Sequence, residues 1–428
     1  MIPVSWRLGL PCEDWSQLFR RPNMSQSDVS LSPTAAYTRR FDLDWLRIIV
    51  FGLLIFYHIG MFFNTEGWHA KSVHMNGAME PLMWLSSPWR LPILFFISGV
   101  AIRFLSDKLG TARFARDRFW RLFPVIVFGM YVIVAPQTWV ELQRAGVIGP
   151  DFWTFYQGYA LSWDGPWSIH TPTWNHLWYV VYLFVYCMLL APVIPALRAL
   201  ADSRALKSVG VFFQRPVIGP ILLITLLVLP FMLIRFTLSE QFETTHNLVW
   251  DWANHANSFT ILLYGYFFAR NEALWSAIDR ALPYCATLTA LSLVFLYVCY
   301  SDWSAVEPHE WLLWTARIDR IVYAWAIILT LLGLARRFGN HDNAARRYLT
   351  EAVFPYYILH QTIIVTVGFW IAGMGYDVWT EFWILMAMTV IGCGLGYELV
   401  KRVPLLRPVM GLKWRGSTKG AGVVSSPA

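Results

Sequence analysis

Two ionisable residues, Arg47 and His58, stand in the first long apolar segment of the chain. They are eleven positions apart, which on an α-helix amounts to about 1100° of rotation and a rise of about 16 Å. Both side chains therefore project from one face of one helix, about half a bilayer apart. Ionisable side chains are costly inside a membrane span and indicate function by default. An imidazole suits proton transfer near neutrality, because its ordinary pKa is about 6.5.

Two further ionisable residues, Arg90 and His360, lie deep in other apolar segments. Arg90 stands in the outer half of the second segment, where it could reach the level of His58. It could stabilise an oxyanion there or form a structural ion pair. His360 follows Pro355 near the middle of the ninth segment, where it could support catalysis or join two helices through a hydrogen bond. The sequence leaves both alternatives open for each residue.

The elements that carry these residues are predicted from composition and apolar runs. Of the 428 residues, 57% are hydrophobic and 14% are charged, whereas an average soluble domain carries about 25% charged residues. We therefore predict an all-α, polytopic integral membrane protein with about ten transmembrane helices. The predicted spans lie near residues 43–63, 81–104, 122–142, 175–196, 217–237, 257–269, 282–300, 318–335, 352–371 and 381–400. The sixth span is short.

The distribution of basic residues predicts the orientation. Of the 34 Lys and Arg residues, 27 fall in segments that share one side of the membrane. These segments are 1–40, 103–121, 198–215, 270–280, 336–347 and 401–419. A bias of this size places both termini in the cytoplasm. The net charge of +7 therefore reflects an inner basic face facing membrane lipid, and it does not indicate nucleic-acid binding.

Three regions are expected along the chain. Residues 1–40 are polar and rich in Ser and Pro, which predicts a flexible cytoplasmic tail. This tail lacks the apolar core of a signal peptide, and Met24 is an alternative start. Residues 41–400 form the membrane domain, and 401–428 form a basic cytoplasmic tail whose end, Gly416–Ala428, is expected to be disordered.

The outer loops carry many aromatic residues and carboxylates. Loop 144–174 is the longest and contains Trp153, Trp163 and Trp174 among others. Such rings could stack on a sugar, or they could form an ordinary interfacial aromatic belt. The outer histidines show neither HxxxH nor HxH spacing, and the five cysteines show no paired spacing. We therefore expect no metal site.

Short motifs occur in order on successive apolar segments. They are Leu43-Asp-Trp-Leu-Arg47 with Tyr57-His58, Trp89-Arg-Leu-Pro-Ile-Leu-Phe-Phe-Ile-Ser98-Gly99, Arg118-Phe-Trp-Arg121-Leu-Phe-Pro124, His176-Leu-Trp-Tyr179 and Tyr356-Tyr-Ile-Leu-His360. With this combination the chain resembles the acyltransferase 3 family of integral-membrane acyltransferases over most of 41–400. The resemblance implies transfer of an acyl group, acetyl or succinyl, from cytoplasmic acyl-CoA to a hydroxyl of an extracytoplasmic glycan or glycolipid. It also implies a bacterial inner membrane and no permanently bound cofactor.

The resemblance assigns roles to individual residues. Arg118 and Arg121 would bind the donor, because residues three apart share one side of a helix and guanidinium groups match phosphate oxygens. Their alternative is general positive-inside charge. His58 would act as a general base or carry the acyl group covalently, unless it only bonds a neighbouring helix. Arg47 would support it, or would only pair with Asp44 and snorkel to the interface.

Two rival classes of protein remain. Charged residues near the midplane and interrupted helices also mark transporters, although the two halves of this chain show no convincing internal repeat. A structural protein or a receptor would leave Arg47, His58, Arg90 and His360 unexplained. Consumption of acyl-CoA by the purified protein separates the enzyme from both rivals.

Overall fold

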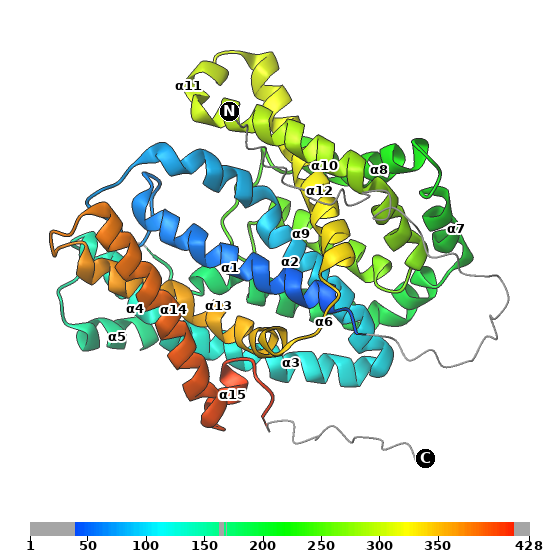
Figure 1. The fold of residues 1–428 in the computed structure, drawn as a ribbon. Helices are drawn as coiled ribbons and strands as arrows, with labels where there is room; N and C mark the ends of the chain where they lie inside the picture. Colours follow the sequence, from blue (N-terminus) through cyan, green and yellow to red (C-terminus); the bar gives the residue numbers. More distant parts are fainter. Residues whose placement is uncertain (1–38, 162–166, 168, 415–428) are drawn as a thin grey trace, which may run out of the picture. The chain divides into compact units, whose positions relative to one another are not determined.

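The computed structural model describes residues 39–161, 167 and 169–414, which form helices and no strands. The long helices are α1 (Phe41–Phe63), α2 (Glu80–Lys108), α3 (Thr111–Phe128), α4 (Ala135–Arg144), α6 (Trp178–Ala201), α8 (Ile218–Thr237), α9 (Trp252–Phe268), α10 (Glu272–Ser301), α12 (Glu310–Phe338), α13 (Ala344–Ile371) and α14 (Val378–Arg402), as seen in Figure 1. The shorter elements are η2 (Gly77–Met79), η3 (Gly129–Ile133), α5 (Phe152–Leu161), η4 (Asn175–Leu177), α7 (Arg204–Phe212), α11 (Trp303–Val306) and α15 (Leu406–Val409). Residues 1–38 of the first predicted tail, with Met24, residues 415–428 of the second, and Trp163 lie outside the described residues. The three-region division therefore stays a prediction.

Nine helical segments of the described chain are long and apolar enough to cross a membrane. They are Phe41–Phe63, Gly77–Lys108, Thr111–Arg144, Asn175–Ala201, Ile218–Thr237, Glu272–Ser301, Glu310–Phe338, Ala344–Ile371 and Val378–Arg402. The prediction of an all-α polytopic membrane protein is confirmed.

The short sixth span corresponds to α9, which has 17 residues. At about 1.5 Å per residue it falls short of a bilayer core of about 30 Å. Its two ends nevertheless contact residues on opposite sides of the bundle. Tyr182, near the start of α6, donates to Asp251 at 2.5 Å, and Arg270 pairs with Asp107, near the end of α2, at 2.7 Å. The helix therefore runs from one side of the bundle to the other, which agrees with about ten crossings.

The third span differs from the prediction in its start and its continuity. We expected it near 122, but α3 begins at Thr111, so Arg118 and Arg121 lie inside a helix instead of at its entry. The helix is interrupted at Gly129–Ile133 by a π-helical turn, and α4 continues with Pro136 in its first turn. Such turns bend a helix. A Cβ on Gly129 would lie 2.2 Å from Leu177 Cδ1, so the absence of a side chain lets η4 approach the bend.

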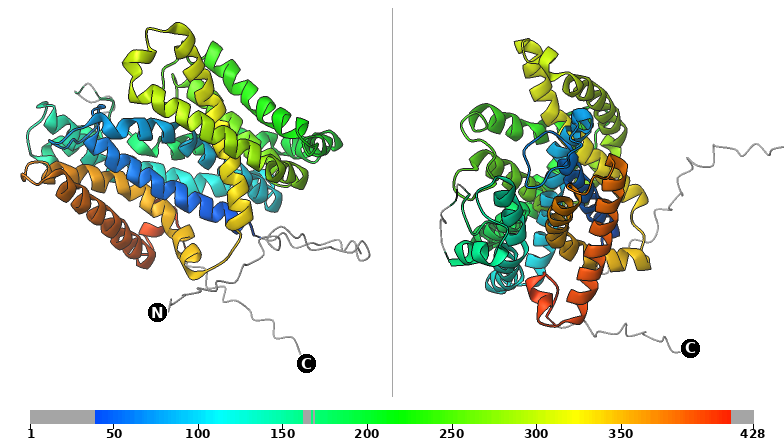
Figure 2. Two further views of the ribbon diagram at one scale, coloured as in Figure 1. Left: turned by 45° about the horizontal axis from the view of Figure 1, so that its top comes forward. Right: turned by 90° about the vertical axis from the view of Figure 1, so that its left-hand side faces the viewer.

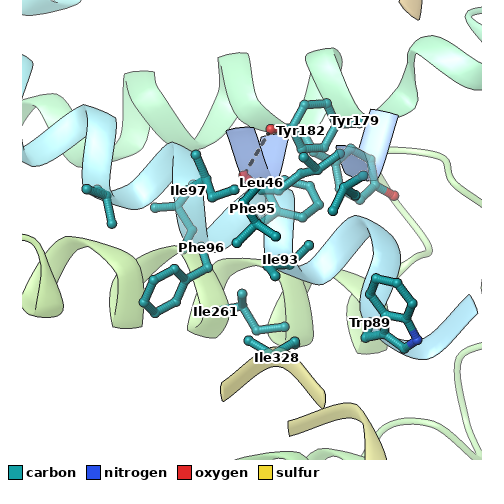
Figure 3. Close-up of a cluster of buried hydrophobic side chains, with 14 of the residues drawn as sticks. Leu46, Trp89, Ile93, Phe95, Phe96, Ile97, Tyr179, Tyr182, Ile261 and Ile328 are labelled. Carbon is teal, nitrogen blue, oxygen red and sulfur yellow. Dashed lines mark hydrogen bonds between the residues drawn. The ribbon is translucent and has the colours of Figure 1, made fainter. Parts of the chain in front are cut away.

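Helix α2 lies at the centre of the packing. It contacts α1, α6, α9, α10 and α12, and its buried residues Ile93, Phe95 and Phe96 face side chains of several helices in Figure 3. Its contact with α9 is the tightest, because a Cβ on Gly99 would lie 1.9 Å from the carbonyl oxygen of Leu262. Small residues allow membrane helices this close approach. Gly99 therefore serves packing.

Helices α1 and α13 run side by side, and α14 covers the other side of α13 (Figure 2). Phe62 of α1 sets this spacing in part, since a Cβ on Gly368 of α13 would lie 2.8 Å from its ring. At the start of α1, Asp44 joins the two helices, because it accepts a hydrogen bond from Arg346 Nη1 of α13 at 2.6 Å. Two helices about 300 residues apart in sequence are thereby held in register along their length.

Candidate active site

His58 of α1 and His360 of α13 are hydrogen-bonded. Nδ1 of His58 lies 2.9 Å from Nε2 of His360, and the ring centroids are 5.0 Å apart. His360 is fully buried, whereas His58 is only partly buried. The hydrogen bond between helices that we considered for His360 is therefore present, and His58 is its partner.

The surroundings of His360 determine which nitrogens carry hydrogen. Nδ1 of His360 lies 2.6 Å from the carbonyl oxygen of Tyr357, which can only accept, so this nitrogen is the donor. In a neutral ring Nε2 of His360 is then an acceptor, and Nδ1 of His58 donates to it. Nε2 of His58 is consequently left with a lone pair and has no hydrogen bond among the described residues. The arrangement orients His58 as a base.

Further polar groups surround the histidine pair. The buried His176 of η4 lies with Nε2 3.1 Å from the carbonyl oxygen of Ile358. Tyr357 donates to the carbonyl oxygen of His176. Gln137 of α4 donates to Thr362 at 2.7 Å. These bonds join η4 and α4 to α13 and fix the helix that carries His360.

A cavity of about 940 Å³ adjoins His58. Its walls come from α1, α2, α8, α9, α10, α12 and α13, from the first residues of α6 and α11, from η4, and from residues 239–246 of the loop after α8. Its aromatic lining includes Trp84, Trp178, Tyr300 and Trp303. A pocket of this size, in which polar and charged side chains converge beside apolar and aromatic ones, is a candidate ligand site.

Arg90 lines the same cavity and is 4% exposed. Its Nη1 donates to Ser86 Oγ at 2.9 Å, and its Cζ lies 3.5 Å from the centroid of the Tyr57 ring. Its Nε has no hydrogen-bond partner, and no ion pair with a described residue is found. Arg90 is thus a buried cation beside His58, with one unsatisfied donor.

Arg47, Arg118 and Arg121 form a separate basic cluster. Arg121 lies within electrostatic reach of both other arginines. Arg47 contacts Asp44 at 3.6 Å, as expected, and Arg118 pairs with its neighbour Asp117 at 2.5 Å. None of the three lines the cavity. The structure therefore brings together His58, Arg90 and His360. It gathers Arg118 and Arg121 of α3 with Arg47, which lies about 16 Å from His58 along α1.

The described aromatic residues of loop 144–174 do not line the cavity. The rings of Phe155 and Trp167 pack together at 5.2 Å, Tyr159 bonds the carbonyl oxygen of Met130 at 2.7 Å, and Trp174 bonds that of His246 at 2.9 Å. The bond of Tyr159 holds α5 against the π-helical turn, which contains Met130. In the described part of the chain, the cavity takes its aromatic lining from other segments.

Several site residues were missed by sequence reasoning. His176 and Tyr357 stand inside the quoted motifs, where their side chains could have been considered. Gln137 is a lone amide in an apolar segment, and that signal was present but unspecific. Among the described residues no group of three or more His, Cys, Asp or Glu could hold a metal ion.

Comparisons with known proteins identify a family and relatives of the chain. The acyltransferase 3 family, described as an acyltransferase domain, matches residues 40–398. The chain is similar to Glucans biosynthesis protein C of Escherichia coli O157:H7 (strain EC4115 / EHEC), with 21% identity over 395 residues that cover 86% of this chain and 93% of the relative. The protein of that name from Escherichia coli O139:H28 (strain E24377A / ETEC) is 21% identical over 389 residues, with 86% and 93% covered. No solved structure matches the chain.

The matched range contains α1 to α13 and nearly all of α14, with the histidine pair, the cavity and the basic cluster. The transporter and receptor classes are therefore set aside. The chain belongs to the acyltransferase 3 family and is a multi-pass membrane acyltransferase that transfers groups other than aminoacyl groups.

Proposed function

We propose that the protein moves an acetyl or succinyl group from cytoplasmic acyl-CoA to a hydroxyl of an extracytoplasmic glycan, in a bacterial inner membrane. The observation that carries this proposal is the oriented imidazole of His58 on the wall of a large cavity. The names of the relatives concern glucans, which supports a glucan-like acceptor.

The donor would bind at the basic cluster. Arg47, Arg118 and Arg121 present three guanidinium groups on the side that the Lys/Arg bias assigns to the cytoplasm. Guanidinium groups bind phosphate through charge-assisted, often bidentate hydrogen bonds, and coenzyme A carries several phosphates. The thin pantetheine arm would then extend along α1 toward His58, past Ser98, whose Oγ lies 2.7 Å from Tyr179 Oη.

The chemistry follows from the free lone pair on Nε2 of His58. This nitrogen takes the proton of an acceptor hydroxyl, and the oxygen attacks the thioester carbonyl. The positive imidazole keeps its Nδ1–H bond to His360, and Arg90 stabilises the negative oxygen of the tetrahedral intermediate. The intermediate collapses by breaking the C–S bond, and the leaving thiolate receives the proton from His58. The products are the acyl ester and free coenzyme A.

A covalent route uses the same lone pair. Nε2 of His58 attacks the thioester, coenzyme A leaves as a thiolate, and an acyl-imidazole forms. The acceptor hydroxyl then attacks the acyl carbon of this positively charged intermediate, and the C–N bond to His58 breaks. The hydroxyl proton passes to Nε2 and from there to the thiolate or to water, which restores the neutral ring. The route lets the donor leave before the acceptor arrives, which suits substrates that approach from opposite sides. Rapid quench with mass spectrometry of the peptide containing His58 separates the two routes.

Two measurements test the proposed function. Mass spectrometry of envelope glycans from cells with and without the gene should reveal an added mass of an acetyl or succinyl unit, which identifies donor and acceptor together. The purified protein should consume the matching acyl-CoA when that glycan is supplied. Identical glycans in both strains, with no consumption of acyl-CoA, would refute the proposal.

A further inference from the structure

Seven basic residues lie outside the cytoplasmic segments, and four of them line the cavity. Arg90 is joined there by Arg235 of α8 and by Arg317 and Arg320 of α12. The other three, Arg47, Lys71 and Arg144, do not line it. This gathering runs against the positive-inside bias, which depletes basic residues from the outer side. Topology therefore does not account for it.

The three additional arginines are close to one another and lack acidic partners. Arg235 lies within electrostatic reach of Arg317 and Arg320, and the carboxylate of Glu240 opposes their effect on it. No hydrogen bond or ion pair to a described residue is found for any of the three. Arg317 only packs against Trp314, on the same helix, at 5.0 Å.

The carboxylates near this cluster do not neutralise it. Glu243 is the one acidic residue that lines the cavity among the described residues. Asp319, between the two arginines of α12 in sequence, accepts from Ser292 of α10 at 2.7 Å and does not line the cavity. Unpaired like charges repel one another, more strongly where water is scarce. A bound anion would relieve this repulsion.

We propose that Arg235, Arg317 and Arg320 bind an anionic group, a carboxylate or a phosphate, on the substrate that occupies the cavity. This assignment rests on the proposed function and names its substrate class. Arg90 is too buried beside His58 to serve the same group, so the cluster binds a part of the substrate remote from the reacting atoms. The aromatic rings of Trp84, Tyr300 and Trp303 lie along the same cavity and offer faces for a sugar.

Two sources could supply the anion. It could be the distal carboxylate of a dicarboxylic acyl group such as succinyl, or a charged substituent on the acceptor. A two-by-two assay separates them: acetyl-CoA or succinyl-CoA as donor, and a neutral or a carboxymethylated glucan oligosaccharide as acceptor. The full-length protein is studied in phosphatidylcholine nanodiscs, so that anionic lipid does not compete.

The test variant is Arg235→Gln/Arg317→Gln/Arg320→Gln. The preference in kcat/KM for the charged over the neutral substrate should fall by about 10- to 100-fold, the loss expected for charge-assisted hydrogen bonds. Loss of a donor preference assigns the anion to the acyl group, and loss of an acceptor preference assigns it to the glycan. The matched control is Arg144→Gln, an exposed outer arginine away from the cavity, which should keep the preference.

A measurement without turnover separates this inference from the proposed function. Glycerol 1-phosphate and monomethyl succinate, with glycerol as the neutral probe, are titrated calorimetrically into wild-type and variant protein. Binding of an anion that the triple variant loses and Arg144→Gln keeps supports the site, even if no acyl transfer is found. If neither anion binds wild type, or if binding or preference survives in the triple variant, the site does not exist.

Discussion

The arginines at the inner ends of the helices and those of the outer cavity differ in how many acidic residues they contact. On the side that the Lys/Arg bias assigns to the cytoplasm, acidic residues sit among the basic ones. Asp107, for example, lies 2.9 Å from Arg103, 3.0 Å from Arg198 and 2.7 Å from Arg270. In the outer cavity, no acidic residue of the described chain is in bonding contact with Arg235 or Arg317. The positive-inside rule already explains why arginines occur on that side, so their presence alone does not indicate a function. The outer arginines have no such explanation, and their position is itself informative.

The histidine pair stands between these two groups. His58 lies about 16 Å from Arg47 along α1 and shares the cavity with the outer arginines. If the donor binds at one group and the acceptor at the other, the reacting atoms must meet at His58. The comparison therefore predicts a graded set of effects, largest at the meeting point and smaller at either end.

The largest effect is expected at His58. His58→Ala should slow transfer by about 10²–10⁴-fold if the imidazole is a general base, and by more if it carries the acyl group. Binding of acyl-CoA should persist, because the basic cluster is distant. Transfer rate and donor affinity are measured on the same preparation.

Two variants control this experiment. His58→Gln keeps a hydrogen-bonding side chain but cannot exchange protons near neutrality, so it should be as inactive as alanine. His74→Gln removes an outer histidine that bonds the carbonyl oxygen of Tyr376 at 2.8 Å, and it should retain transfer. Near-normal turnover in His58→Gln would make His58 structural and move the catalytic role elsewhere.

His360 should come next, as a positioning residue. His360→Phe removes the acceptor for Nδ1 of His58, and the misplaced ring should slow transfer by about 10²-fold. His360→Gln can accept the same bond through Oε1 and should recover part of the rate. The pH dependence of the rate should change in the Phe variant, because the environment of the ionising imidazole changes.

A purely structural role for His360 would give a different result. Both variants would then lose folded protein without altering the pH profile of what remains. Thr366→Val offers a matched control. Thr366 follows His360 on the same helix and donates to the carbonyl oxygen of Thr362 at 2.7 Å. It should leave both the rate and the profile intact.

A smaller effect, confined to donor affinity, is expected at the cytoplasmic end. Arg118→Ala and Arg121→Ala should each weaken binding of coenzyme A by about 10- to 100-fold, because a charge-assisted bond contributes about 1.5–3 kcal/mol. Arg116→Ala, an exposed neighbour on the same helix, should have little effect. Equal binding by wild type and the double variant would reduce Arg118 and Arg121 to topology charges.

Contacts between residues near one another in the sequence could be predicted, whereas contacts between distant segments could not. The shared face of Arg47 and His58 and the Asp44–Arg47 pair follow from helical geometry alone, and the structure has both. The bond between His58 and His360 joins residues 302 positions apart. Only the packing of α1 against α13 creates it, and no local pattern encodes that packing.

The same limit explains the features that sequence reasoning missed. Arg235, Arg317 and Arg320 are scattered in sequence, and only the approach of α8 to α12 makes them a cluster. The aromatic residues of α5 looked available to a sugar, but whether a ring faces a ligand or another ring is decided by tertiary packing. The interruption at Gly129–Ile133 has no periodic signal, since the residues on both sides continue the same apolar pattern.

The smallest effect concerns Lys71, an outer basic residue that does not line the cavity. Its Nζ donates to the carbonyl oxygen of Met61 at 2.7 Å and to Asn64 Oδ1 at 2.6 Å. Burial lowers the pKa of Lys71 from 10.5 to about 8, and this exceeds the opposing effect of Glu66. Lys71→Met should therefore leave any preference for anionic substrates unchanged, unlike the triple arginine variant.

The shifted pKa of Lys71 gives this prediction a stability readout. Between about pH 8 and 10.5 the folded chain has released a proton that the unfolded chain still holds, so the stability contribution of Lys71 rises with pH across this window. The Tm of wild type relative to Lys71→Met should therefore increase from pH 8 to pH 10. A constant difference in Tm would contradict the lowered pKa of Lys71. A loss of anion preference in Lys71→Met would show that outer basic residues act alike wherever they lie. The distinction between the cavity arginines and the rest would then fail.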